Sequence, residues 1–86
     1  MIRPEKLQSA LYALQGVLML LRQMAYEHRP HSEIAGLADY AEDLPRLLAG
    51  TEDETEVFRA TLVDVSVKYR CALVLQCFDE TAPASW

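Results

Sequence analysis

The chain has 86 residues, which is the length of one small domain and leaves no room for two. Hydrophobic residues make up 51% of it and charged residues 24%, a balance typical of a globular chain and not of a disordered one. Its net charge of −5 repels a phosphate backbone, and two cysteines are too few for a disulfide scaffold. We therefore expect a single domain over residues 1–86 that binds no nucleic acid.

The first segment, residues 4–28, has the pattern of a helix. Pro4 suits the first helical turn. Pro30 ends the helix because a proline ring disfavours helical geometry at the residue before it. The fifteen uncharged positions 7–21 span only about 22 Å as a helix, which is too short for a bilayer core of roughly 30 Å. Polar residues within that stretch argue against a signal peptide. We expect no membrane association and a cytoplasmic location.

Apolar residues surround most of this first helix. One apolar stripe repeats at the helical spacing, and a second apolar set lies elsewhere on the same helix. A glycine in the narrow polar strip that remains allows another backbone to approach closely. The residues expected to mediate self-association are Tyr12, Gly16, Met19, Leu20, Gln23 and Tyr26.

The second segment, residues 33–49, is predicted to be a helix that Ser32 caps and Gly50 ends. Pro45 lacks the N–H that a continuous helix needs and crowds the preceding turn. We therefore predict a break near Asp43, which caps a short second piece.

The third segment, residues 52–78, begins with a capping box formed by Thr51 and Glu54. Within it, residues 61–70 alternate in a way that also fits a strand. Helix is favoured because no Gly, Pro or Asn interrupts residues 55–79 and no other segment offers a partner strand. Residues 79–86 are predicted to be a loop tail.

These segments predict an all-α fold, a three-helix bundle. Its first and third helices would be about 37–40 Å long and the broken middle one nearer 25 Å. Because one short helix cannot cover two long ones, we expect a second copy or another protein to complete the bundle.

Residues able to carry chemistry are few. His28 and His31 flank Arg29-Pro30, which gives too few ligands for a metal and places a cation beside them. Cys71 and Cys77 fit buried, reduced thiols, and neither a nucleophile–base pair nor a glycine-rich phosphate loop is present. We expect no enzyme activity, no cofactor and no metal.

Acidic residues concentrate in the middle of the chain. Residues 31–56 hold eight acids and one base, a local charge of −7. Such a segment either presents a negative surface to a basic partner or simply places acids near a helix N-terminus, where they are favoured. The residues expected to bind a basic partner are Glu42, Asp43, Glu52, Asp53, Glu54 and Glu56, with Tyr40 as an aromatic anchor.

Short motifs in the chain are similar to those of a group of short, uncharacterised bacterial helical proteins. The motifs are the Leu37-Ala38-Asp39 run of the middle helix and Leu44-Pro45 a few residues later. This resemblance implies an all-helical fold and transfers no binding or catalytic residue. Only its size and acidity make the chain similar to immunity proteins.

Two functional hypotheses follow. In the first, the chain is a small acidic inhibitor or immunity protein that neutralises a basic partner such as a toxin or nuclease. In the alternative, it is a structural homodimer in which the first helix packs against its symmetry mate.

Overall fold

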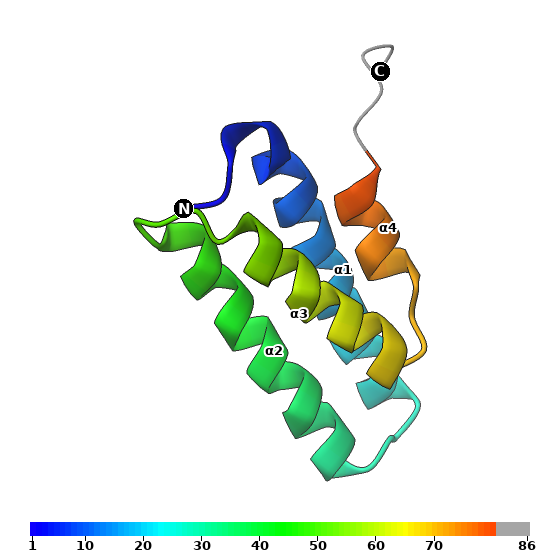
Figure 1. Ribbon diagram of the computed structural model, residues 1–86. Helices are drawn as coiled ribbons and strands as arrows, with labels where there is room; N and C mark the ends of the chain where they lie inside the picture. The colour runs from blue at the N-terminus through cyan, green and yellow to red at the C-terminus, as the bar shows by residue number, and fades with distance from the viewer. Residues whose placement is uncertain (81–86) are drawn as a thin grey trace.

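The computed structural model describes residues 1–80, which form four helices (Figure 1). The helices are α1 (Pro4–Tyr26), α2 (His31–Ala49), α3 (Thr55–Lys68) and α4 (Leu73–Asp79). These 80 residues contain no strand, so the all-α prediction is confirmed and the strand alternative for residues 61–70 is wrong. The predicted number of three helices is also wrong, because the third segment forms two.

The third segment divides at Arg70. Its backbone is left-handed there, with φ of 54°, and the Cys71 N–H donates to the Ser66 carbonyl at 3.0 Å. This six-residue closure is the Schellman motif that ends many helices, usually with glycine at the left-handed position. The predicted helix 52–78 therefore ends at Lys68, and the chain turns back into α4.

The end of α1 has the same geometry. His28 has φ of 55°, its N–H donates to the Ala25 carbonyl at 3.1 Å, and the Arg29 N–H donates to the Met24 carbonyl at 3.0 Å. Both hydrogen bonds belong to the Schellman pattern. α1 accordingly ends at Tyr26, two residues before the predicted boundary at residue 28.

The predicted break in the second segment is wrong. α2 is continuous from His31 to Ala49 with Pro45 inside it, and Pro30, not Ser32, occupies the N-cap position. The proline removes one backbone hydrogen bond near the end of the helix. The last turns stay in register because Leu44 is fully buried and Leu47 and Leu48 pack against the core. Gly50 follows the helix, as predicted. Its backbone conformation is extended.

The start of α3 does not use the predicted capping box, because the helix begins at Thr55 and not at residue 52. The Asp53 carboxylate accepts hydrogen bonds from the Thr55 backbone N–H at 3.0 Å and from the Thr55 hydroxyl at 2.6 Å. One otherwise unpaired amide of the first turn is thereby satisfied.

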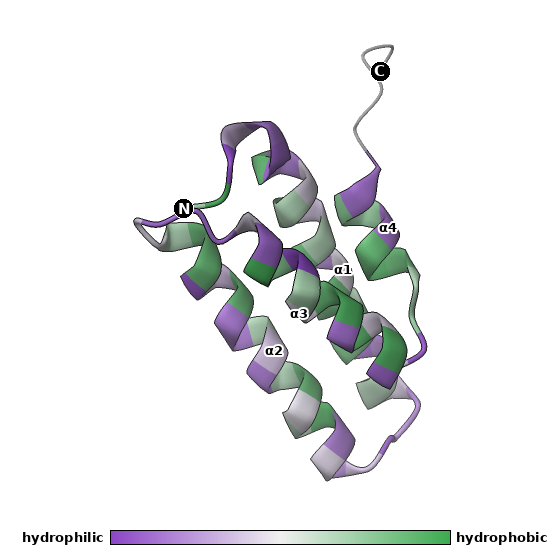
Figure 2. Ribbon diagram, in the orientation of Figure 1, coloured by the Kyte–Doolittle hydropathy of each residue, from purple (hydrophilic) through white to green (hydrophobic). Residues whose placement is uncertain are grey.

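The four helices surround one core. α1 contacts α2 and the short helix α4 and touches α3, while α2 and α4 lie on opposite sides of α1 (Figure 1). Green, hydrophobic positions alternate with purple ones along each helix in Figure 2, as expected for helices with one buried face. The largest fully buried side chains are Phe58, Phe78, Ile2, Met24, Leu37, Leu44 and Leu62.

The turn at Arg70 returns α4 onto α1. A Cβ atom at Gly16 would lie 3.4 Å from Cγ1 of Val74, a side chain of α4 that is fully buried. The close approach predicted at Gly16 is therefore made by α4 of the same chain. As a result, α4 covers part of one apolar side of α1, the side on which Gly16 lies.

Candidate protein-binding surfaces

The other apolar side of α1 is exposed. Its large side chains recur at seven-residue intervals, which is two helical turns, so they share one face. This outer face of α1 also carries Gln8, Gln15 and Arg22, which are exposed between the apolar residues. The exposed apolar residues are Leu11 (52%), Tyr12 (47%), Leu18 (49%), Met19 (54%) and Tyr26 (75%). Large apolar side chains gathered on one exposed helix face are a feature of sites that bind other proteins.

The residues predicted for self-association fall in two places. Tyr12, Met19, Gln23 and Tyr26 are exposed, and the Gln23 amide donates to the Glu27 carboxylate at 3.0 Å. Leu20 is half-buried against the core, and Gly16 lies under α4.

Leu11 and Leu18 belong to the apolar stripe that repeats at the helical spacing, so the sequence pattern did not identify them as surface residues. Their spacing fits a core position as well as a surface one. Which side of α1 is covered depends on how α2 and α4 pack against it.

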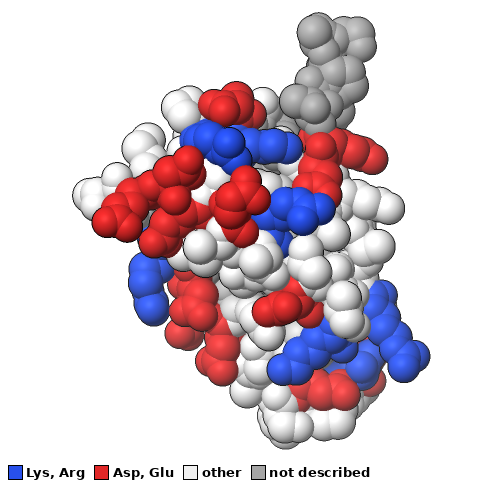
Figure 3. Space-filling model, viewed as in Figure 1, with Lys and Arg blue, Asp and Glu red and all other residues white. Residues whose placement is uncertain are grey.

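The predicted acidic residues gather where α2 ends and α3 begins (Figure 3). Arg46 lies 3.6 Å from Asp43, and Arg3 pairs with two other members of the group. Six carboxylates therefore stand against two guanidinium groups and the Met1 ammonium, which donates to the Glu52 carbonyl; the local charge is −3. We call Glu42, Asp43, Glu52, Asp53, Glu54 and Glu56 the acidic cluster.

Tyr40, the predicted aromatic anchor, does not project from the acidic cluster. It is half-buried and packs edge-on against Tyr69 of the α3 end, with ring centroids 6.3 Å apart. The Lys68 ammonium lies 5.8 Å from the Tyr40 ring centroid. The Tyr40 ring therefore packs against residues of its own chain.

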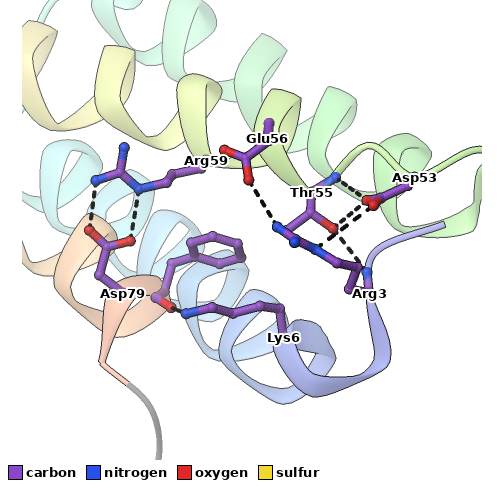
Figure 4. A network of polar contacts seen from close by, with 8 residues as sticks. Arg3, Lys6, Asp53, Thr55, Glu56, Arg59 and Asp79 are labelled. Carbon is purple, nitrogen blue, oxygen red and sulfur yellow. Dashed lines mark hydrogen bonds and ion pairs between the residues drawn. The ribbon is translucent and has the colours of Figure 1, made fainter.

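Two members of the acidic cluster attach the N-terminal segment to α3 (Figure 4). The Arg3 guanidinium donates to Glu56 at 2.9 Å and lies 3.8 Å from Asp53, while the Arg3 backbone N–H donates to the Thr55 hydroxyl at 2.9 Å. The hydrogen bonds from Thr55, with help from the Arg3 charge, lower the pKa of Asp53 below its ordinary value. These contacts hold Ile2 in the core, where it is 1% exposed.

A second polar group fastens α4 (Figure 4). Arg59 of α3 donates to both carboxylate oxygens of Asp79 at 2.9 Å, and Lys6 of α1 donates to the Phe78 carbonyl at 2.8 Å. The Arg59 hydrogen bonds hold the pKa of Asp79 below its ordinary value, and the Arg59 and Lys6 charges act in the same direction. α4 is therefore tied at its C-terminal end to both α1 and α3.

A cleft of about 620 Å³ lies at the end of the molecule where α1 and α3 terminate. Arg29, Lys68 and Arg70 bring positive charge to its lining, beside the half-buried Cys71 thiol. Arg29 is engaged by Glu33 at 2.8 Å and by Glu27 at 3.4 Å, so these two acids offset part of that charge. Burial raises the pKa of Tyr69, which also lines the cleft.

Neither metal-binding nor membrane-spanning features occur in residues 1–80. This part of the chain holds no group of three or more His, Cys, Asp or Glu side chains arranged to bind a metal. None of its helices combines the length and the apolar character needed to cross a membrane. His28 and His31 are exposed at the turn between α1 and α2.

Comparison of the chain with protein-family models, curated proteins and solved structures finds no match.

Proposed function

We propose that this chain is a non-enzymatic protein-binding module and that the outer face of α1 is its binding surface. The observation that carries the proposal is the exposure of five large apolar side chains on a helix whose other side already supplies the core. A helix that serves only its own fold needs one apolar side.

Covering the outer face of α1 gives a partner a clear energetic gain. Full burial of a large apolar side chain contributes about 1.5–3 kcal/mol, so burying the exposed half of Leu11, Leu18 or Met19 contributes about 1 kcal/mol each. Aromatic residues and methionine are enriched in protein interfaces, and Tyr12, Met19 and Tyr26 are of these types.

A second candidate function is neutralisation of a basic protein, such as a toxin or nuclease, through the acidic cluster. In its favour, Glu42, Glu52 and Glu54 remain in addition to the two acids that Arg3 engages and to Asp43, which lies near Arg46. A negative surface of this kind accelerates capture of a basic partner. We favour the outer face of α1 over the acidic cluster as the binding surface, because burial of apolar surface supplies affinity, whereas exposed charge mainly raises the association rate.

Site-specific photocrosslinking in the producing cell tests the proposal. The photoreactive residue p-benzoylphenylalanine is placed at position 19 on the α1 outer face, at position 52 in the acidic cluster, or at position 64 on the exposed side of α3. We expect a discrete crosslinked adduct from position 19, absent from position 64, that is lost when Leu18→Glu is added.

Two other outcomes would count against the α1 face. An adduct from position 52 and none from position 19 favours neutralisation of a basic partner over the α1 face. Equal labelling from positions 19 and 64, or no adduct from position 19, contradicts binding through α1.

A further inference from the structure

We infer that the partner of the α1 outer face is a second copy of this chain, with the two α1 helices antiparallel about a two-fold axis at Gln15. This inference rests on the proposed function and names the occupant of the same surface.

The charges on the exposed side of α1 match an antiparallel copy. Among the exposed residues of α1, only Glu5 and Arg22 are charged, and they lie about 26 Å apart near opposite ends. A two-fold axis at Gln15 places residue 8 of one copy opposite residue 22 of the other. Arg22 then lies within one helical turn of Glu5 of the second copy, and the pair forms twice in the dimer.

A parallel pairing of the same face is disfavoured by these charges. It sets Glu5 against Glu5 and Arg22 against Arg22 of the second copy, and like charges in contact oppose association. A basic or acidic partner protein gains little from a face that carries one charge of each sign.

The apolar side chains fit the same two-fold axis. Leu11 and Leu18 lie two turns apart along one edge of the outer face, and Tyr12 and Met19 lie two turns apart along the other. In the antiparallel pair, Leu11 meets Leu18 of the second copy and Tyr12 meets Met19 of the second copy. The two Gln15 side chains meet on the axis, where their amides can hydrogen-bond each other.

An interface of one helix from each copy is small, below the roughly 1,200–2,000 Å² of typical stable complexes. We therefore expect association in the micromolar range. The arrangement leaves the acidic cluster outside the interface, because that cluster lies where α2 ends and α3 begins.

Sedimentation equilibrium of the full chain with charge-reversed variants tests the arrangement. Glu5→Arg or Arg22→Glu alone replaces two attractive contacts in the dimer by two repulsive ones, and we expect dimerisation to weaken about fivefold. The double variant Glu5→Arg/Arg22→Glu restores opposite charges and returns the dissociation constant to the wild-type value. Asp64→Lys, a reversal on the exposed side of α3, is the matched control and leaves it unchanged.

Circular dichroism of each variant confirms that it is folded. Dimers that are insensitive to both reversals, or that the double variant does not restore, overturn the antiparallel arrangement while leaving binding through α1 intact. The expected dissociation constant for an interface of this size is in the micromolar range. If the wild-type chain stays monomeric up to about 200 µM, a second copy is not the partner of the α1 outer face. In that case the crosslink from position 19 decides separately whether α1 binds another protein.

Discussion

At the scale of single residues, a few ion pairs and hydrogen bonds attach the N-terminal segment and the short helix α4. Arg3 ties residues 1–3 to the start of α3, and Arg59 and Lys6 tie the seven-residue α4 to α3 and α1. A helix of two turns has little stability of its own. Its position therefore depends on packing of Val74 and Phe78 and on these polar contacts.

The Arg59–Asp79 pair makes part of the stability depend on pH. Because the folded chain lowers the pKa of Asp79, the pair stabilises the fold fully above the ordinary carboxyl value of 3.8 and loses this contribution as pH falls through the lower folded value. The pair is partly exposed, so we expect a modest effect.

Urea denaturation between about pH 5 and pH 2 measures this contribution. We expect the wild-type midpoint to fall more steeply with acidification than the Asp79→Asn midpoint, because the variant has no carboxylate to protonate at this site. Asp64→Asn removes an exposed carboxylate of α3 and serves as the control. Identical pH profiles for wild type and Asp79→Asn would contradict a stabilising Arg59–Asp79 pair.

At the scale of elements, the helical spacing of apolar residues predicted where most of the helices form, while their boundaries depended on contacts that local patterns do not contain. Pro4 began α1 as predicted, but Asp53 and not Thr51 organises the start of α3. The missed break at Arg70 has a specific cause. The left-handed position of a Schellman turn usually holds glycine. Here Arg70 occupies that position, and His28 occupies the corresponding position at the end of α1.

Arg70→Gly tests whether that turn stores strain. A left-handed residue with a Cβ atom costs roughly 1–2 kcal/mol, partly offset by the greater freedom that glycine has in the unfolded chain. We expect Arg70→Gly to raise the free energy of unfolding by about 0.5–1 kcal/mol in chemical denaturation.

Ala60→Gly provides the matched control, because residue 60 is an exposed position in the middle of α3. There glycine lowers helix stability by about 1 kcal/mol. If both variants lose stability equally, Arg70 is not strained and the turn has another origin.

At the scale of the whole molecule, the composition of α1 predicted more apolar surface than one partner helix could cover. Five large apolar side chains of α1 are exposed. The exposed apolar surface is smaller than predicted, because the divided third segment supplies α4, which covers α1 at Gly16. That division depends on the reversal at Arg70, so the sequence alone could not indicate which side of α1 stays exposed. The acidic cluster was predicted from local composition, whereas the pairing of Arg3 with residues more than 50 positions away was not.

The outer face of α1 lies outside the buried core of the chain. Leu18→Ala and Leu37→Ala remove the same atoms from two helices, at positions that are 49% and 0% exposed. At a chain concentration of about 1 µM, where so small an interface is dissociated, we predict that Leu18→Ala lowers the free energy of unfolding by at most about 1 kcal/mol, because only about half of the side chain is buried in the fold. By contrast, Leu37→Ala lowers it by about 2–5 kcal/mol. Equal losses from the two substitutions would place Leu18 inside the fold and contradict a binding role for this face.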